Sequence, residues 1–219
     1  MTFGFVPSSA HLDLRHAKHR GSSRGGADLT TVMERLEPES VYEQFLAFRQ
    51  NLGMEVLPAS GGPSPFGVLA QRLRAGKLVA LPCDRDVTGS GIEVDFFGEK
   101  ALMMGGPAAL AVQTGAALMP ATLWFEGNRW GVRLHEEIPV PESGDRWHKA
   151  AAMTQQIASA FEQGIREHPA DWHMLQRVFV ADLDPERLAA GRAKVAARER
   201  AARNGATPGS PAGRAAGAP

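Results

Sequence analysis

The sequence predicts an α/β fold in which a mixed, largely parallel sheet is flanked by helices. Short apolar runs suited to strands alternate with longer segments whose apolar residues recur at helical spacing. The chain has 219 residues, of which 43% are hydrophobic and 22% are charged, as is ordinary for a globular protein. Its formal net charge is zero, so no overall positive field would attract nucleic acid, and no nucleic-acid partner is expected.

The predicted strands lie in one domain that covers residues 29–184. Segments that are β-branched, alternating or apolar predict them, and the run LVALPC is typical of a strand that is buried on both faces. The strands are expected at 29–35, 54–57, 78–83, 92–97, 117–125 and 130–137. We expect the strands at 78–83 and 92–97 to belong to the same sheet.

Helices are predicted between these strands, where apolar residues recur every three or four positions. In the longest of them, one stripe is formed by Met153, Ile157, Phe161 and Ile165. The helices are expected at 39–52, 66–74, 105–114, 146–167 and 171–176.

Both ends of the chain differ in composition from the central domain. Within residues 1–28 the stretch HLDLRHAKHRGSSRGG is basic and shows neither strand nor helix period, which predicts a disordered basic arm over residues 1–28. His16 and His19 are spaced as metal ligands can be, but no cysteine or carboxylate completes a set, so no metal site is predicted. Residues 185–219 are rich first in Ala and Arg and then in Gly, Pro and Ala, which predicts a frayed helix and a disordered tail.

The sharpest candidate for a functional site is Asp84-Arg85-Asp86, directly after the strand at 78–83. In an extended chain, alternation directs both aspartates to one side and Arg85 to the other. Active sites of open α/β sheets commonly lie at the carboxyl ends of strands. Two close carboxylates can orient an imidazole, bind a metal ion or hold a cationic ligand, whereas in a solvated turn they bind the backbone. We expect both aspartates to lie at the mouth of a groove.

A resemblance to the second half of the lysophospholipid acyltransferase superfamily is carried by the block LVALPCDRDVTGSGIEVDFFGEKALMMGGPAALAVQTGAALMP. The lipid A late acyltransferases of this superfamily have an apolar strand, an acidic-x-Asp pair, a short loop and a V-x-V/F-x-F-F-G segment. Asp84 and Asp86 match the acidic pair, and residues 92–98 match the last segment. The resemblance implies a lysophospholipid-acyltransferase-like fold.

The match is closer still to one branch, the phosphatidylinositol mannoside acyltransferases. Their T-T-V-x-E-R-L-x-P-E block is matched by TTVMERLEPE, and their later segments resemble WFEGNRWGVRL and HPADWHMLQRVFVADL. The blocks occur in the family's order and extend over residues 28–184.

This resemblance implies transfer of an acyl chain from acyl-CoA, a co-substrate, to a mannose hydroxyl of a phosphatidylinositol mannoside, without a cofactor. In the family a histidine deprotonates the acceptor hydroxyl and an acidic residue orients it, in an H-x-x-x-x-D/E arrangement. A base is needed because a sugar hydroxyl is a poor nucleophile at neutral pH. The implied partners are acyl-CoA and a glycolipid, met through peripheral contact with the cytoplasmic face of the cell membrane.

The resemblance also implies roles for particular residues. Asp84 and Asp86 would support catalysis. The residues assigned to substrate binding are Arg35, Arg49, Arg85, Phe96 and Phe97. The arginines would hold phosphates of the donor or of the lipid anchor, because a guanidinium binds phosphate in a bidentate way. Structural roles are the alternative, since a lone arginine is usually solvated and paired phenylalanines usually belong to a core.

The H-x-x-x-x-D/E arrangement is not found at any of the seven histidines. The residues before Leu29 do not resemble the family's N-terminal half, so we expect that this part of the domain is missing through truncation or a frame shift. We therefore expect little or no acyltransferase activity from this chain, because a positioned base contributes about 10² to 10⁴ in rate.

Two other functions remain open from the sequence. Asp84-Arg85-Asp86 also fits the D-x-D pattern with which glycosyltransferases bind Mg²⁺ or Mn²⁺, although that function leaves the FFG segment unexplained. A non-catalytic lipid-binding remnant would differ from an acyltransferase only in turnover.

The most apolar window, 101–125, is interrupted by glycines and prolines, so a helix that spans a membrane is not predicted.

Overall fold

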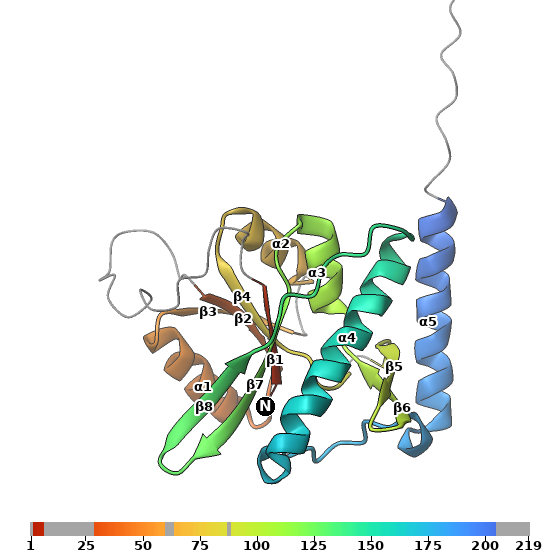
Figure 1. Cartoon of the computed structure of the whole chain (residues 1–219). Coiled ribbons are helices and arrows are strands. Elements are labelled where there is room, and N and C mark those ends of the chain that lie inside the picture. The colour runs from red at the N-terminus through yellow and green to blue at the C-terminus, as the bar shows by residue number, and fades with distance from the viewer. Residues whose placement is uncertain (1, 7–28, 60–63, 87–88, 205–219) are drawn as a thin grey trace, which may run out of the picture.

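The computed structural model describes residues 2–6, 29–59, 64–86 and 89–204, which form a mixed α/β domain (Figure 1). The strands are β1 (Thr2–Val6), β2 (Leu29–Met33), β3 (Met54–Pro58), β4 (Leu78–Pro82), β5 (Ile92–Phe96), β6 (Glu99–Met103), β7 (Met119–Glu126) and β8 (Arg129–Leu134). The helices are α1 (Glu39–Asn51), α2 (Phe66–Arg74), α3 (Gly106–Thr114), α4 (Arg146–Glu167) and α5 (Pro185–Asn204). The predicted α/β class is confirmed.

The main sheet has six strands in the order β3-β2-β4-β1-β7-β8. Only the pairs β2–β3 and β2–β4 are parallel, while β4–β1, β1–β7 and β7–β8 are antiparallel. The prediction of a largely parallel sheet is therefore wrong. The turn between β7 and β8 is too short for a crossover, so these strands can only pair in antiparallel fashion.

Strand β1 is a second difference from the sequence prediction, which placed residues 1–28 in a disordered arm. Thr2–Val6 lies inside the sheet, where Phe3 pairs with Pro82 on β4 and with Ala121 on β7. Its partners are distant in the sequence, so its place between β4 and β7 cannot be read from the segment itself. Residues 7–28 and 205–219, for which disorder was predicted, lie outside the described residues.

The predicted strand at 92–97 exists but does not join the main sheet. It pairs with β6, a strand that was not predicted, in a separate antiparallel hairpin. The turn is made by Phe97 and Gly98, whose φ angles of 53° and 85° are both left-handed, as in the tight turns that suit hairpins. Ile92, Val94 and Phe96 are buried and alternate with exposed residues, so one face of this hairpin belongs to the core.

Three helices cover one face of the main sheet. α2, α3 and α4 pack against one another in sequence and contact β4, β1 and β7, respectively. The predicted stripe of α4, Met153 to Ile165, is buried in this layer. Asp145 caps the N-terminus of the helix, and its carboxylate accepts a hydrogen bond from the backbone N–H of His148 at 3.0 Å.

The predicted helix at 171–176 is wrong. A single 3₁₀ turn, Pro169–Asp171, occupies the start of this segment, and the residues after it are not helical. The carboxylate of Asp171 instead accepts a hydrogen bond from the backbone N–H of Phe125 on β7 at 3.0 Å. The segment is thus tied to the sheet rather than to a helix of its own.

At the end of the described chain, α5 occupies the segment where the sequence predicted a frayed helix.

Within the described residues, no helix combines the length and the apolar character that crossing a membrane requires.

Glu55 on β3 joins two strands and a helix. Its carboxylate oxygens accept hydrogen bonds from Nε and Nη2 of Arg72 on α2, both at 2.7 Å, and one of them also accepts from Oγ1 of Thr30 on β2 at 2.8 Å. These bonds, chiefly those from Arg72, lower the pKa of Glu55 to about 2. α2 leads directly into β4, so this contact fixes the parallel strands of the sheet relative to one another.

We predict that Glu55→Gln lowers the free energy of unfolding by about 2 kcal/mol at neutral pH, because an amide cannot replace the bidentate charge-assisted pair. The unfolded carboxyl titrates near 4.5 and the folded one near 2, so the stabilisation is complete above 4.5 and is lost as the pH falls towards 2. Urea unfolding at pH 7 and at acidic pH measures this difference. Glu43→Gln, on the exposed side of α1, is the control, and equal losses for the two variants would contradict the prediction.

Gly164 marks the closest approach of α4 to the sheet. A Cβ at this position would lie 2.5 Å from Cγ2 of Thr122, which is itself buried on β7. We predict that Gly164→Ala lowers the free energy of unfolding by about 1 to 3 kcal/mol through overpacking. The control is Gly67→Ala in α2, where nothing lies within 4 Å of the added methyl group. Thermal unfolding that ranks the two variants in the opposite order would refute this contact.

Candidate functional site

The candidate site lies where the parallel strands β2 and β4 end side by side. In their register Leu29 is opposite Leu78 and Thr31 is opposite Ala80. The residues that follow Met33 therefore lie beside those that follow Pro82, and the shared edge brings Glu34 next to Asp84-Arg85-Asp86. The predicted position of the acidic pair at the carboxyl end of a strand agrees with the structure, and Asp84 is half-buried there.

Arg85 bridges the two strand ends. Its Nη2 lies 2.8 Å from Oε2 of Glu34, and both side chains remain partly exposed. Sequence analysis did not identify Glu34, because its pairing depends on the parallel contact between strands that are distant in the sequence. A partly exposed ion pair of this kind contributes little stability, so its main effect is to hold the guanidinium at the edge of the sheet.

Asp86 closes the loop that leads away from the site. Its Oδ2 accepts a hydrogen bond from the backbone N–H of Gly91 at 2.9 Å. A Cβ on Gly91 would lie 2.7 Å both from Cβ of Asp86 and from the carbonyl oxygen of Met103, so only glycine fits this turn. The described contact of Asp86 is thus structural, which matches the alternative that a turn uses its carboxylate to bind the backbone.

Arg49 reaches the same edge from α1. Its Nη1 donates a hydrogen bond to Sδ of Met33, the last residue of β2, and its guanidinium lies 5.9 Å from the centre of the Phe45 ring. Neither contact neutralises the charge, since a thioether and a ring are uncharged. Arg49 is therefore available to pair with an anion at the strand ends.

Arg35 is neutralised within its own segment. It forms a bidentate pair with Glu39 at the start of α1, with its Nη2 2.7 Å and its Nε 3.0 Å from the two carboxylate oxygens, and its guanidinium lies 5.8 Å from the Tyr42 ring centre. The hydrogen bond lowers the pKa of Glu39 and raises that of Arg35. Of the arginines assigned to substrate binding, Arg35 and Arg85 are therefore each paired with a carboxylate, whereas Arg49 has no such pair among the described residues.

The two phenylalanines assigned to substrate binding lie apart from this edge. The five-residue step from Gly91 to Phe96 along β5 carries the chain about 17 Å away. Phe96 is fully buried, and its ring contacts those of Phe97, Trp172 and Phe179. Phe96 therefore occupies a core position in this structure, and its assignment to substrate binding stays a prediction.

Phe97 makes structural contacts as well. Its backbone N–H donates a hydrogen bond to Oε1 of Glu162, and its ring centre lies 5.4 Å from the guanidinium of Arg166, also on α4. The FFG segment therefore turns the hairpin and docks it on α4, which explains its composition without a ligand.

One histidine lies at the same level of the sheet as the strand ends. Nε2 of His135 lies 3.0 Å from Oγ1 of Thr122, and burial lowers the pKa of this imidazole, which favours its neutral form. β1 separates β7 from β4, which places Thr122 about 10 Å from β4. The only sequence signal for this position was the histidine itself, which has no acidic partner five residues on.

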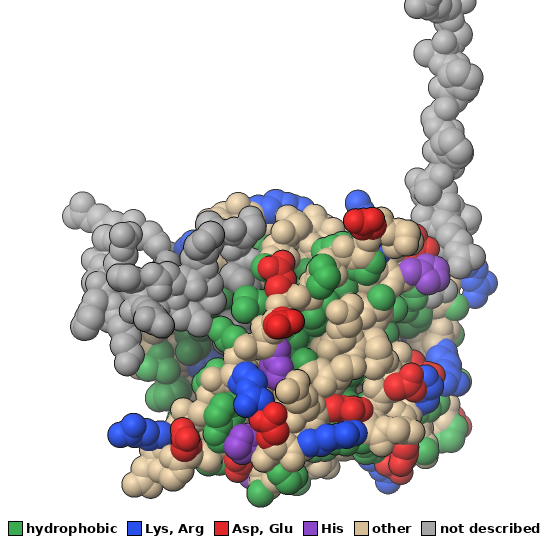
Figure 2. All heavy atoms as spheres, viewed as in Figure 1, with side chains coloured by type: hydrophobic (Ala, Val, Ile, Leu, Met, Phe, Trp, Pro, Cys, Tyr) green, Lys and Arg blue, Asp and Glu red, His purple; other side chains and the backbone are tan. Residues whose placement is uncertain are grey.

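The described residues contain no cluster of three or more His, Cys, Asp or Glu side chains that could hold a metal ion. Figure 2 shows acidic and basic side chains interspersed over the visible face, without a large area of one sign.

Comparison with known proteins confirms the resemblance drawn from the motifs. A family model described as bacterial lipid A biosynthesis acyltransferase matches residues 22–180. A phosphatidylinositol mannoside acyltransferase of Mycobacterium tuberculosis is 53% identical over 161 residues, which cover 73% of this chain and 49% of the relative. The protein of the same name from Mycolicibacterium smegmatis is 51% identical over 161 residues, 73% of this chain and 51% of the relative. The chain thus spans about half the length of these curated relatives.

The contribution of the Asp86–Gly91 hydrogen bond to stability can be measured separately from any catalytic role of Asp86. We predict that Asp86→Ala lowers the free energy of unfolding by at least about 1 kcal/mol, because the Gly91 N–H loses its acceptor. Asp86→Asn keeps an acceptor oxygen and should stay close to the parent in urea unfolding. If the alanine variant were as stable as the asparagine variant, the loop would not depend on this bond.

Proposed function

Because the chain belongs to the family of bacterial lipid A biosynthesis acyltransferases, we propose that it acts in moving an acyl chain from acyl-CoA to a mannose hydroxyl of a phosphatidylinositol mannoside. The observation that carries the proposal is the 53% identity over 161 residues with a phosphatidylinositol mannoside acyltransferase. Acyl-CoA is then a co-substrate, and the reaction needs no further cofactor.

In the proposed reaction the acceptor hydroxyl oxygen attacks the thioester carbonyl carbon. A C–O bond forms, the C–S bond breaks, and coenzyme A leaves as a thiol with the proton of the hydroxyl. A general base removes that proton. None of the histidines in this chain has the family's H-x-x-x-x-D/E arrangement, so we assign the base to a segment that corresponds to the part of the relatives outside the match.

The groups that this chain supplies lie at the carboxyl ends of β2 and β4. Arg49 has no carboxylate against its guanidinium in the described structure, and Arg85 is held in place by Glu34, so both suit phosphates of the donor or of the lipid anchor. Half-buried Asp84 is proposed to support the reaction by orienting a neighbouring donor group. Asp86 contributes indirectly, through the loop to Gly91.

Peripheral contact with the cytoplasmic face of the membrane is proposed for the whole protein, because the acceptor is a lipid. Large apolar side chains are exposed on two elements: Phe45 and Phe48 are 48% and 61% exposed on α1, and Phe125 and Trp130 are 51% and 63% exposed on the β7–β8 hairpin. Aromatic side chains favour the boundary between lipid and water, so these surfaces support such a contact.

The family match does not support a metal-dependent glycosyltransferase. The D-x-D pattern is explained here by the Arg85–Glu34 pair and by the bond from Asp86 to Gly91. A non-catalytic lipid-binding role differs from the proposed function only in that the protein would bind the lipid without turning it over.

Acyl transfer from a labelled long-chain acyl-CoA to a phosphatidylinositol mannoside tests the proposal. The 219-residue chain is compared with a chimera that adds the segment of the Mycolicibacterium smegmatis relative left outside the match. We expect turnover by the chimera to exceed that by the chain alone by about 10² to 10⁴, the usual contribution of a positioned base. Equal turnover would show that the base lies within this chain, and no turnover by the folded chimera would contradict the proposed function.

Arginine variants of the chimera test the site. Arg49→Gln should raise the KM for acyl-CoA by roughly tenfold, because it removes one charge-assisted contact to phosphate. Arg74→Gln at the exposed end of α2 removes the same charge from a helix that does not reach the strand ends, and it should leave the KM unchanged. Equal effects of the two substitutions would place the phosphate site elsewhere.

A further inference from the structure

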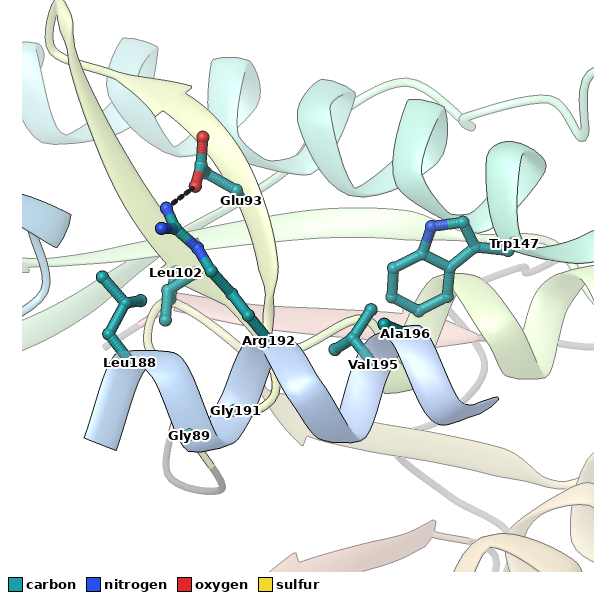
Figure 3. A pocket seen from close by; sticks show the side chains of 10 residues that line it. Gly89, Glu93, Leu102, Trp147, Leu188, Gly191, Arg192, Val195 and Ala196 are labelled. Atoms are coloured by element: carbon teal, nitrogen blue, oxygen red, sulfur yellow. Dashed lines mark hydrogen bonds and ion pairs between the residues drawn. The ribbon is translucent and has the colours of Figure 1, made fainter. Parts of the chain in front are cut away.

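A cavity of about 270 Å³ lies between α5 and the β5–β6 hairpin. Figure 3 shows Trp147 of α4 at one end, facing Val195 and Ala196 of α5, and the ion pair between Glu93 and Arg192 at the other. Leu102 and Leu188 add apolar walls. We call this space the α5 cavity. It is distinct from the candidate site, since neither Asp84 nor Asp86 lines it.

Two contacts fix α5 against the domain and so define the cavity. Gly191 packs on the loop before β5, where an added Cβ would lie 1.6 Å from the carbonyl oxygen of Gly89. Next to it, Nη2 of Arg192 lies 3.0 Å from Oε2 of Glu93. These contacts hold one part of α5 close to the loop, while Trp147 lines the cavity opposite the next turn of α5.

The lining determines the chemistry of a ligand. Between Trp147 and the ion pair the walls are hydrocarbon, so a polar group bound there would lose its hydrogen bonds to water without replacement. Arg192 is already paired with Glu93, so the polar end of the cavity carries no net charge. A closed apolar cavity of about 150 Å³ binds benzene, and by volume alone the α5 cavity has room for roughly ten carbon atoms. The α5 cavity is half open to solvent, so part of a bound chain would stay in contact with water.

We infer that the α5 cavity binds an unbranched hydrocarbon chain of about this length, with its polar end at the Glu93–Arg192 pair. α5 begins at Pro185, beyond the residues 22–180 that match the family model, so the family match covers the hairpin side of the cavity and Trp147 but not the side formed by α5. The inference does not depend on the proposed transfer reaction. A bound chain would also touch Gly91, whose backbone N–H donates a hydrogen bond to Asp86.

A matched pair of substitutions on α5 tests the inference with decanol as the probe. Ala196→Leu fills the cavity, whereas Ala193→Leu adds the same atoms to the exposed side of the helix. Calorimetric titration should show saturable binding to the parent chain, a loss of roughly tenfold or more in Ala196→Leu, and no change in Ala193→Leu. Absence of saturable binding to the parent, or equal binding by the two folded variants, would overturn the inference.

A second measurement does not depend on the folding of a filled variant. A brominated decanol should quench the fluorescence of the parent, and much of the quenching should disappear in Trp147→Phe, since this ring forms one wall. Quenching that is unchanged in Trp147→Phe would place the chain elsewhere. If decanoate displaces decanol, the natural ligand is a free fatty acid. If decanoyl-CoA displaces it, the natural ligand is a thioester. Failure of both to compete with decanol would count against an acyl chain as the occupant.

Discussion

The carboxylate of Glu55 holds together the part of the fold on which the candidate site depends. It binds Arg72 of α2 and Thr30 of β2 at once, and it lies on β3. β2 and β4 end side by side only if β2 stays in register with both neighbours, and α2 sets where β4 begins. The position of Glu34 beside Arg85 therefore follows from a contact near the other end of the strands. The lowered pKa of Glu55 shows that its charged form is the one that the fold stabilises.

The charged side chains at the carboxyl edge of these strands fall into two groups, those that bind within their own segment and those that contact the end of another element. Arg35 and Asp86 are engaged locally, one with Glu39 and the other with the backbone of Gly91. Arg49 and Arg85 instead extend along the edge, one against Met33 and the other against Glu34. A substrate phosphate could reach these two guanidinium groups without first breaking a buried ion pair, which is why we place the donor there.

Local patterns predicted the elements that local interactions stabilise. The stripe of α4 and the apolar run of β4 were predictable because burial of one face or of both faces leaves a period in the sequence. β1 was not, because its five residues gain their hydrogen bonds from β4 and β7, which are far away in the chain. The sheet to which β5 belongs was missed for a similar reason, although Gly98, which the left-handed turn of its hairpin uses, was a local signal.

The position of the site in the chain was predictable, but the side chains that its residues contact were not. Position after a buried strand indicated Asp84-Arg85-Asp86, whereas the pairing of Arg85 with Glu34 depends on which strands lie side by side. The same limit led to Phe96 being assigned to a substrate, because motif matching cannot tell a buried ring from one that lines a groove.

Hydrogen exchange of the intact chain, with and without a long-chain acyl-CoA, tests the location of the donor site most directly. We expect added protection at the ends of β2 and β4, in peptides that contain Glu34 and Asp84-Arg85-Asp86. We expect no added protection at the Phe97-Gly98 turn. Protection confined to that turn, or absent from both strand ends at saturating acyl-CoA, would contradict this location of the donor site.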